Sequence, residues 1–435
     1  MFKRLGALPG IVKKDIVIIG GGASGAMAAW LAAERGLSVS LVEASDRGAY
    51  HPCSGVFPLH SFKGFPPLPG SVFERDMVTM KPMSPTSSVV LDGREFATTL
   101  GKIILRSTFD KYMLDMAEKK GADIHDLTRA KKIQVTSDHV AATCETSGLP
   151  EFTIQGDVLF LATGTSGFHL HDQLGIEKPP VVQSLICEYE CSERHVEDVL
   201  SSGAYHYYMN KQVTSIGPFW ITCRKDSFNA GIIDHHVSWE RYKNTIEKDP
   251  RVKDFFTGVK EKTWHGQKSS HAIALIPRAP IKYPHGNRLL VLGDAAGLTH
   301  PFYYEGVWQG RASAKYAVET VARLREEKKV PTAENLAGYK ALLARNLVNK
   351  FNRSGRKNSW LFWEAMSDES LWTFFIEALA KNKDLRALLV KCFELDYAET
   401  TDDVDFKAGE MIFQAIPTLK KILYAPYFLR AGAIK

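Results

Sequence analysis

The chain has 435 residues, enough for two or three domains with large hydrophobic cores. Its formal net charge of +6 is mild and spread along the chain, which argues against nucleic-acid binding and leaves an acidic cofactor or an anionic membrane surface as partners. None of the six cysteines forms a C-x-x-C pair, so neither a zinc site nor an iron–sulfur cluster is expected. The chain shows no signal peptide and no apolar run of about 18 residues, which predicts a cytoplasmic protein without a spanning helix.

Residues 15–43 contain the first recognisable unit. Asp15–Ile19 is rich in Ile and Val, as a buried parallel strand requires. Gly20, Gly22 and Gly25 follow with G-x-G-x-x-G spacing. In this motif the first glycine permits a tight turn, the second lets a pyrophosphate approach the backbone, and the third lets the helix pack closely on the strand.

The rest of this unit completes a dinucleotide-binding pattern. A helix is predicted from about Ala23 to Gly36, and Ser38–Val42 is predicted to be the second strand. Glu43 follows this strand, about 20 residues after the glycine turn, where a carboxylate accepts hydrogen bonds from a ribose hydroxyl. The pattern predicts an ADP-containing dinucleotide and leaves FAD and NAD as alternatives.

An irregular segment rich in Pro and Gly follows over residues 44–85 and includes GAYHPCSG at positions 48–55. A loop of this length in a compact protein is usually functional, and its aromatic content argues against disorder. Ser87–Leu91 and Phe96–Leu100 are then predicted to form a hairpin around the turn dipeptide Asp92-Gly93.

The next region alternates between two patterns. Arg106 opens a predicted helix over 107–120, and Asp157–Ala162 is a predicted strand that leads into Thr163-Gly164. From about residue 180 to 276, aromatic-rich strands alternate with turns, which predicts an antiparallel sheet inserted between the halves of the dinucleotide domain. The predicted strands are Ser184–Glu190, Tyr205–Asn210, Val213–Cys223 and Phe228–His235.

The dinucleotide-domain pattern returns at residues 287–297, NRLLVLGDAAG. Leu289–Leu292 reads as a buried strand, and Gly293-Asp294 stands at its carboxyl end, where ligands bind in parallel sheets. From Pro331 onward only helices are predicted. The tail over 406–435 mixes basic and apolar residues, so it either lies on a membrane surface or packs on the protein with its basic residues in solvent.

Four separated segments together resemble the FAD-binding fold of the para-hydroxybenzoate-hydroxylase type and, within it, the geranylgeranyl reductase family. They are the opening strand–helix–strand unit, Arg106 in RSTFDKYML, the turn Ala162-Thr163-Gly164, and GDAAG at 293–297 followed by Pro301 and Glu305-Gly306. The resemblance covers roughly residues 15–324 and implies FAD as the cofactor, with Asp294 hydrogen-bonded to the ribityl chain. The residues expected to bind FAD are Gly20, Gly22, Ala23, Ser24, Gly25, Glu43, Ala44, Cys53, Ser54, Gly55, Arg106, Ala162, Thr163, Gly164, Gly293, Asp294, Pro301, Glu305, Gly306 and Val307.

The predicted fold class is α/β, with a Rossmann-like FAD-binding domain interleaved with an antiparallel β-sheet substrate domain and followed by a C-terminal helical region. The FAD-binding domain is expected over 1–85, 101–180 and 277–330, the substrate sheet over 86–100 and 181–276, and the helical region over 331–435.

The resemblance implies an FAD-dependent reductase that hydrogenates isolated C=C bonds of a polyprenyl (geranylgeranyl-type) lipid or another apolar alkene. A hydride from N5 of reduced flavin would reach one alkene carbon, and an acid would protonate the other. Cys53 is the expected proton donor, because HPCSG at 51–55 aligns with a Cys-Gly-Gly segment near the flavin in this family, although Ser54 replaces the first glycine. An inert cysteine is the alternative for Cys53.

The substrate is expected to contact Tyr207, Phe219 and Trp220. The family carries an aromatic-x-Trp-x-Phe-Pro motif in its substrate sheet, and GPFWITC at 217–223 keeps the Trp but has Thr222-Cys223 in place of Phe-Pro. For each of these aromatic residues, a role in the core of the sheet is the alternative.

Two other functions remain open on the same fold: a flavin monooxygenase or halogenase, and an electron-transfer flavoprotein that reduces a quinone. No second nucleotide motif is present, so the expected electron donor is a ferredoxin, a carrier flavoprotein, or NAD(P)H bound without its own domain. The expected location is cytoplasmic, with the tail as a candidate for peripheral contact with the inner face of the membrane. No metal and no nucleic acid are expected.

Overall fold

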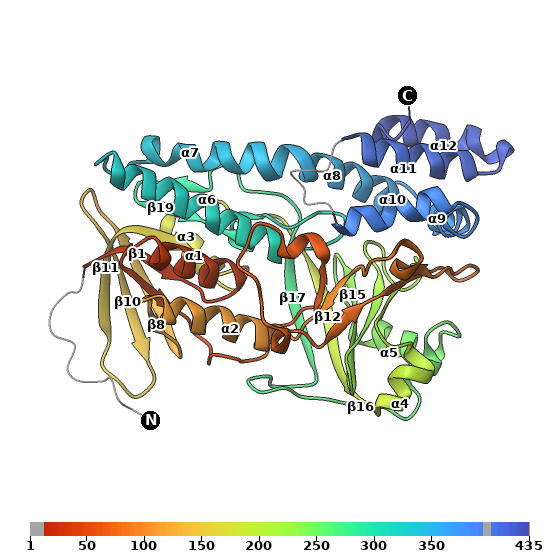
Figure 1. The fold of residues 1–435 in the computed structure, drawn as a ribbon, viewed down its shortest axis with the longest axis horizontal. Helices are drawn as coiled ribbons and strands as arrows, with labels where there is room; N and C mark the ends of the chain where they lie inside the picture. Colours follow the sequence, from red (N-terminus) through yellow and green to blue (C-terminus); the bar gives the residue numbers. More distant parts are fainter. Residues whose placement is uncertain (1–12, 395–401, 435) are drawn as a thin grey trace.

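The computed structural model describes residues 13–394 and 402–434 (Figure 1). The fold is α/β, as predicted, with a Rossmann-like domain, a largely antiparallel sheet and a C-terminal helical region. Residues 1–12 of the predicted FAD-binding domain, and residues 395–401 and 435 of the predicted helical region, lie outside the described residues.

The Rossmann-like domain is built on an eight-stranded sheet, here called the first sheet, whose main path runs β18-β19-β11-β1-β2-β8. Its strands are β1 (Lys13–Ile19), β2 (Val39–Val42), β8 (Asp123–His125), β9 (Thr128–Val135), β10 (Val140–Thr146), β11 (Phe152–Leu161), β18 (His285–Gly286) and β19 (Leu289–Val291). Strands β8, β2, β1, β11 and β19 are parallel, so their carboxyl ends meet at one edge.

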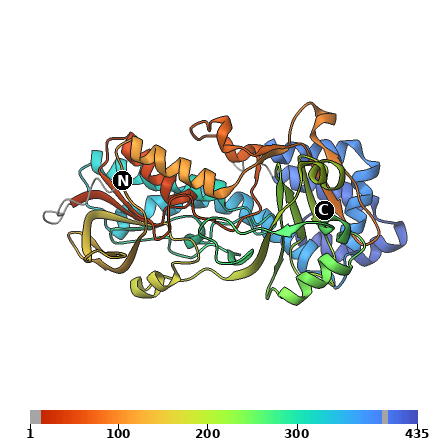
Figure 2. The same ribbon diagram turned by 90° about the horizontal axis from the view of Figure 1, so that it is seen from below.

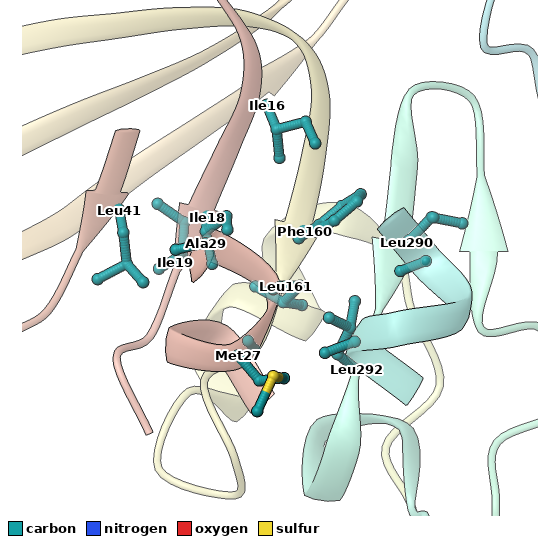
Figure 3. Close-up of a cluster of buried hydrophobic side chains, with 14 of the residues drawn as sticks. Ile16, Ile18, Ile19, Met27, Ala29, Leu41, Phe160, Leu161, Leu290 and Leu292 are labelled. Carbon is teal, nitrogen blue, oxygen red and sulfur yellow. The ribbon is translucent and has the colours of Figure 1, made fainter. Parts of the chain in front are cut away.

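The core of this domain lies between the first sheet and its helices. Helix α1 (Ala23–Glu34) packs beside α2 (Arg106–Lys119) and α6 (Val307–Glu326), and α3 (Phe168–Leu174) follows β11. Figure 3 shows side chains from β1, α1, β2, β11 and the β19 region gathered into one cluster. Most of them, including Ile18, Met27 and Phe160, are fully buried. This packing fixes the ends of β1, β11 and β19, where the glycine turns begin.

The second sheet also has eight strands, on a path β16-β12-β15-β14-β13-β5-β6 with β17 beside β12. Its strands are β5 (Thr79–Met83), β6 (Leu91–Asp92), β12 (Val181–Glu190), β13 (Ala204–Tyr208), β14 (Phe219–Cys223), β15 (Ser227–Asp234), β16 (Lys260–Glu261) and β17 (His271–Pro277). All its pairs are antiparallel except β13 with β5. Helices α4 (Glu193–His195) and α5 (Trp239–Lys248) belong to this region.

Short elements connect these parts. A three-stranded sheet joins β3 (Val56–Pro58), β7 (Gly101–Ile103) and β4 (Arg75–Met77). The 3-10 turns cover Leu59–Phe62, Gly70–Val72, Gly93–Phe96, Lys253–Phe256 and Gly293–Ala296, and π-helical turns cover Val196–Leu200, Ala344–Asn352 and Trp360–Glu364.

The predicted hairpin around Asp92-Gly93 is wrong. The Asp92 carboxylate accepts a 2.9 Å hydrogen bond from the Arg94 backbone N–H and opens a 3-10 turn instead. Strand β6 pairs with β5, whereas β7 pairs with β3 and β4. The dipeptide Asp-Gly suits both a hairpin turn and the N-cap of a helical turn. Here the pairing of β6 and β7 with strands distant in the sequence favours the N-cap.

The predicted strand over Val213–Cys223 is too long, because only Phe219–Cys223 forms β14. Gly217 has a φ of 79°, and Pro218 has no backbone N–H to donate to a ladder. The Thr214 hydroxyl donates to the Gly217 carbonyl oxygen at 2.6 Å, which closes the preceding residues into a loop.

The C-terminal region is helical, as predicted. Its helices are α7 (Ala333–Leu343), α8 (Arg353–Ser359), α9 (Ser370–Lys381), α10 (Lys383–Glu394), α11 (Asp402–Ala415) and α12 (Thr418–Ala431). In Figures 1 and 2, α7 lies along the Rossmann-like domain, and the later helices lie over the second sheet. Trp363 and Trp372 from the helices share a buried cluster with Tyr207 and Trp220 of the second sheet. Among the described helices, none is long and apolar enough to cross a membrane.

Candidate functional site

The turn after β1 has the geometry that its glycine spacing predicts. Gly20 has a φ of 105°, and a Cβ there would lie 2.4 Å from the Ala162 carbonyl oxygen. A Cβ on Gly25 would lie 1.8 Å from the Gly20 carbonyl oxygen. A Cβ on Gly22, by contrast, would meet no atom within 4 Å. The turn is therefore closed by backbone contacts on one side and open at Gly22, the N-cap of α1.

Glu43 lies at the end of β2 and is held against this turn. Its carboxylate accepts hydrogen bonds from the backbone N–H of Gly21 at 2.6 Å and of Ser45 at 2.7 Å. Ala44 lies between Glu43 and Ser45 on the short connection that follows β2. The carboxylate thus has a fixed position beside the glycine turn, and Gly20 bonds through its N–H to the Val42 carbonyl oxygen.

The carboxyl end of β19 approaches α1 from the opposite side. A Cβ on Gly293 would lie 2.1 Å from the Ser24 hydroxyl oxygen, so only glycine fits there. The next residue, Asp294, accepts a 3.1 Å hydrogen bond from the Thr299 hydroxyl, and burial raises the pKa of its carboxyl. Gly306 is the N-cap of α6 and would place a Cβ 2.6 Å from an Asp294 carboxylate oxygen. The carboxyl of Asp294 therefore lies at the positive end of α6.

Arg106 begins α2 and is buried. Its guanidinium donates to both carboxylate oxygens of Asp110 at 3.0–3.2 Å. Burial disfavours the charge, but Asp110 and the thiol of Cys53 together raise the pKa of Arg106 above its ordinary value. The structure thus brings Arg106 and Cys53, 53 positions apart, close enough to interact electrostatically.

The loop that carries Cys53 is attached to the second sheet. The side-chain amide of Asn229, fully buried on β15, donates to the carbonyl oxygens of Cys53 at 3.0 Å and Ser54 at 3.2 Å. The indole N–H of Trp220 donates in turn to the Asn229 side-chain oxygen at 3.2 Å. Gly55 has a φ of 77° and packs against the Ile104 carbonyl. The sequence carried no signal for Asn229, because a single polar residue in an apolar strand has many explanations.

A second attachment of this loop is a buried ion pair. Glu188 on β12 and Arg224 after β14 have side chains that are about 1% and 2% exposed, and their charged atoms lie 2.6 Å apart. The hydroxyl of Tyr50 donates to Glu188 at 3.0 Å, and the indole N–H of Trp264 donates at 3.1 Å. The network joins the 44–85 loop to β12 and to the residue that follows β14 in the second sheet. Like Asn229, this network was not predicted from the sequence.

A cavity of about 240 Å³ begins at this loop. The polar part of its wall includes Cys53, Ser54, His60, Ser61, His300 and Glu305. The apolar part comes from the C-terminal helices, with Leu361, Phe362, Trp372, Phe375, Leu389, Phe393 and Ile412, and from the loop and the second sheet, with Val56, Phe57, Met80 and Leu91. The cavity therefore lies between the Cys53 loop, the second sheet, the N-terminus of α6 and the helical region. An elongated, mostly apolar ligand fits such a wall.

The remaining expected cofactor residues lie near the glycine turn after β1 or near the N-terminus of α6. Ala162, Thr163 and Gly164 follow β11 beside the glycine turn, and Gly164 is open, with no atom within 4 Å of a Cβ. Val307 is the first residue of α6 and lines the cavity. The Glu305 carboxylate is held inside the protein by the Ser61 hydroxyl at 2.9 Å and His60 at 3.0 Å. Pro301 packs against Gly355.

The three residues expected to contact substrate lie in different surroundings. Tyr207 is in the cavity wall. Phe219 stacks on Tyr242, with ring centroids 5.9 Å apart, in a separate core beneath α5. Trp220 shares the face of Tyr207 but is outside the cavity wall and bonded to Asn229. Of the three, the structure brings only Tyr207 to the cavity.

The site fits a dinucleotide that carries a ring system. Free N–H groups and open space at Gly22 suit a diphosphate, because the N-terminus of α1 is electropositive. A second helix N-terminus, that of α6, faces the cavity near Asp294 and would stabilise negative charge on a reduced flavin.

Comparison with known proteins bears on the cofactor and the family. Residues 15–57 match a family described as FAD dependent oxidoreductase. The chain is 27% identical over 304 residues to a digeranylgeranylglycerophospholipid reductase of Methanocaldococcus jannaschii, which covers 68% of this chain and 73% of that protein. It is 22% identical to a geranylgeranyl diphosphate reductase of Rhodobacter capsulatus, over 71% of this chain and 75% of that protein.

This chain is a FAD-dependent oxidoreductase related to the geranylgeranyl reductases. The resemblance read from its sequence and the FAD cofactor are both confirmed.

Solved structures share the fold of this oxidoreductase. A geranylgeranyl bacteriochlorophyll reductase-like protein from Thermoplasma acidophilum superposes with a TM-score of 0.72 at 18% identity, over 96% of this chain and all of that chain. A flavin-dependent brominase superposes with a TM-score of 0.67 at 16% identity, over 93% of this chain and 98% of that chain. At these identities the structures show a common architecture. They do not distinguish the chemistry of a reductase from that of a brominase.

Proposed function

We propose that this oxidoreductase hydrogenates isolated C=C bonds of a polyprenyl lipid of the geranylgeranyl type. The observation that carries the proposal is the cavity, whose wall includes Cys53, the N-terminus of α6 and many apolar side chains of the C-terminal helices. A mostly apolar cavity beside a thiol suits a long hydrocarbon that presents one double bond at a time to the flavin. The relatives named for geranylgeranyl lipids support this substrate class.

The reaction adds one hydride and one proton across the double bond. FAD, when bound and reduced, supplies the hydride to one alkene carbon. Cys53 is the proposed donor of the proton to the other carbon, since its thiol lies in the cavity wall. After the transfer, the thiolate would lie beside the Arg106 guanidinium, which compensates its charge. Water would restore the proton.

The second sheet has a positioning role in this scheme. Asn229 holds the carbonyl oxygens of Cys53 and Ser54, so the thiol is directed by a buried strand and not by a free loop. The expected FAD contacts from Gly20 to Gly25, Glu43, Asp294 and Gly306 remain part of the proposal. The electrons are proposed to come from a ferredoxin, a carrier flavoprotein or NAD(P)H. The reduction is proposed to take place at the inner face of the membrane.

The experiment is an anaerobic conversion. Protein reduced with dithionite is mixed with a geranylgeranyl-bearing phospholipid, and the lipid is analysed by mass spectrometry for added hydrogen pairs. Cys53→Ser should keep FAD and slow the conversion by about 10²-fold or more, because a positioned acid contributes at least that much. Cys191→Ser is the matched control, since Cys191 is also half-buried but lies outside the cavity wall.

Two results would contradict the proposal in different ways. Equal conversion by Cys53→Ser and Cys191→Ser would remove the thiol from the mechanism and leave the reductase assignment intact. An unchanged lipid with the unmodified protein would favour oxygen or a quinone as the electron acceptor, as in the monooxygenase or halogenase and quinone-reducing alternatives. The shared fold of the flavin-dependent brominase makes oxygen uptake the first of these to measure.

A further inference from the structure

Helix α12 presents an apolar stripe to solvent. Leu419, Ile422, Leu423 and Leu429 have side chains that are 90%, 81%, 63% and 53% exposed. With exposed Pro426 between them, they follow helical spacing and share one face. Leu419 and Ile422 are the two most exposed large hydrophobic residues in the described part of the chain. Contiguous exposed apolar surface of this kind marks a contact with a partner or a membrane.

The opposite face of α12 anchors the helix to the protein. Tyr424 and Phe428 are buried, and their rings contact Phe374 and Phe413 with centroids 5.6 and 5.2 Å apart. The helix ends in a cap at Gly432, whose N–H bonds to the Leu429 carbonyl. The stripe is therefore held in one orientation by a packed core.

The charges around the stripe select its partner. Lys420, Lys421 and Arg430 lie on α12, and no acidic residue occurs from Met411 to Ile434. Basic residues beside an exposed apolar helix face attract anionic lipid head groups. A second copy of this chain is disfavoured, because its net charge is +6 and the same basic helix would meet itself.

The stripe also lies close to the cavity wall. Gly409 and Ile412 of α11, and Ala433 just after α12, form part of the cavity wall. Figure 1 shows α11 and α12 at the outer edge of the molecule, beyond α9 and α10. The same pair of helices thus faces the cavity on one side and solvent on the other.

We propose that the α12 stripe docks the enzyme on an anionic bilayer surface, so that an isoprenoid tail passes from the bilayer to the cavity beside α11. The reason for docking rests on the proposed function, whereas the docking itself is a property of this surface. Its basic residues would lie at the head groups while the stripe enters the acyl boundary.

The test is co-sedimentation of the FAD-loaded protein with vesicles of phosphatidylcholine and phosphatidylglycerol that contain no isoprenoid lipid. The triple variant Leu419→Ser, Ile422→Ser, Leu423→Ser should bind at least tenfold less, and the fold should be kept because these side chains touch solvent. The matched control is Leu127→Ser, Ile273→Ser, Val330→Ser, whose side chains are also more than half exposed but are scattered elsewhere. It should bind like the unmodified protein.

A separate variant tests the charges. Lys420→Glu with Lys421→Glu should lose the preference for anionic over pure phosphatidylcholine vesicles. Equal vesicle binding by the two triple variants, or no binding by the unmodified protein, would overturn the proposal. So would a sedimentation analysis in which the unmodified protein self-associates, the α12 triple variant is monomeric, and neither binds vesicles, because the partner would then be a second copy.

Failure of docking and failure of the proposed function are distinguishable. With a detergent-dispersed lipid substrate, the α12 triple variant should reduce the substrate as fast as the unmodified protein, since the stripe lies outside the cavity wall. A protein that binds vesicles but never reduces the lipid would overturn the proposed function and leave docking in place.

Discussion

The glycine turn after β1 and the wall of the cavity are built by different means. The turn is one short stretch packed against Ala162 after β11, and backbone atoms approach so closely that side chains do not fit at Gly20 and Gly25. The cavity wall comes from separate segments: the Cys53 loop, the second sheet, the N-terminus of α6 and the C-terminal helices. Buried polar bonds from Asn229 and Glu188 hold the loop in place.

This difference indicates how each part responds to change. The cofactor end depends on the absence of side chains, so an added methyl group affects it most. The substrate end depends on buried polar partners, and removal of one partner leaves another without compensation. Four substitutions or conditions test this contrast.

The largest effect is expected at the buried ion pair. Glu188→Gln leaves the Arg224 guanidinium buried without a carboxylate and should lower the free energy of unfolding by about 3–5 kcal/mol in urea titrations. The matched control is Glu193→Gln, which breaks the nearby exposed pair with Lys225 and should cost about 0–1 kcal/mol. Similar losses in the two variants would show that the Glu188 network does not hold the loop.

Acid should act on the cavity wall through His300. Burial lowers the pKa of His300 to about 3, and its Nδ1 accepts the backbone N–H groups of Phe302 and Tyr303. The unfolded chain binds a proton below pH 6.5 and the folded chain only near pH 3, so this histidine makes stability fall as the pH drops through that window. The slope is at most about 1.4 kcal/mol per pH unit. His300→Asn, which keeps an acceptor, should flatten the slope in urea titrations at several pH values, and an unchanged slope would contradict this role.

An added methyl group should separate cofactor binding from folding. Gly22→Ala places a Cβ in open space at the N-cap of α1, so the protein should fold but bind FAD at least tenfold more weakly, or about 1.4 kcal/mol. Gly70→Ala is the control, because a Cβ there also meets no atom within 4 Å. The flavin absorbance per protein measures the difference. If the Gly22→Ala variant kept its full FAD content, the diphosphate would not lie against Gly22.

The smallest effect is expected at Trp220. Trp220→Phe removes the hydrogen bond to Asn229 and should cost about 0.5–1.5 kcal/mol of stability. Because Trp220 is outside the cavity wall, the KM for the lipid should not change. A rise in KM without loss of stability would instead place Trp220 against the substrate, as its position in the sequence motif suggested.

The conformation of the glycine turn and its flanking elements could be predicted from the sequence, because it depends on local geometry. The strand, the glycine spacing, the helix and Glu43 are contiguous, and each has the conformation that its local chemistry favours. The strand end that carries Asp294 was predictable for a similar reason, since a buried parallel strand can be recognised from its own residues. The helical C-terminal region followed from its periodicity.

The substrate end was harder to predict, because strand β14 is buried on both faces and shows no alternation. Without alternation, nothing in the sequence separates Phe219, which faces the core beneath α5, from Trp220 on the opposite face. Contacts such as Arg106 with Cys53 and Glu188 with Arg224 join positions that only the tertiary fold brings together. The exposed side of α12 also required the structure, since some of its apolar residues, such as Tyr424 and Phe428, are buried and others are exposed.

We propose that the electrons of the reduced cofactor pass to an alkene in the cavity. The most direct measurement is the absorbance of the dithionite-reduced protein after anaerobic mixing with a geranylgeranyl-bearing lipid, compared with its fully saturated counterpart. We expect the oxidised flavin spectrum to return only with the unsaturated lipid, with one hydrogen pair gained for each flavin reoxidised. A flavin that stays reduced with both lipids and reoxidises only when oxygen or a quinone is admitted would contradict it.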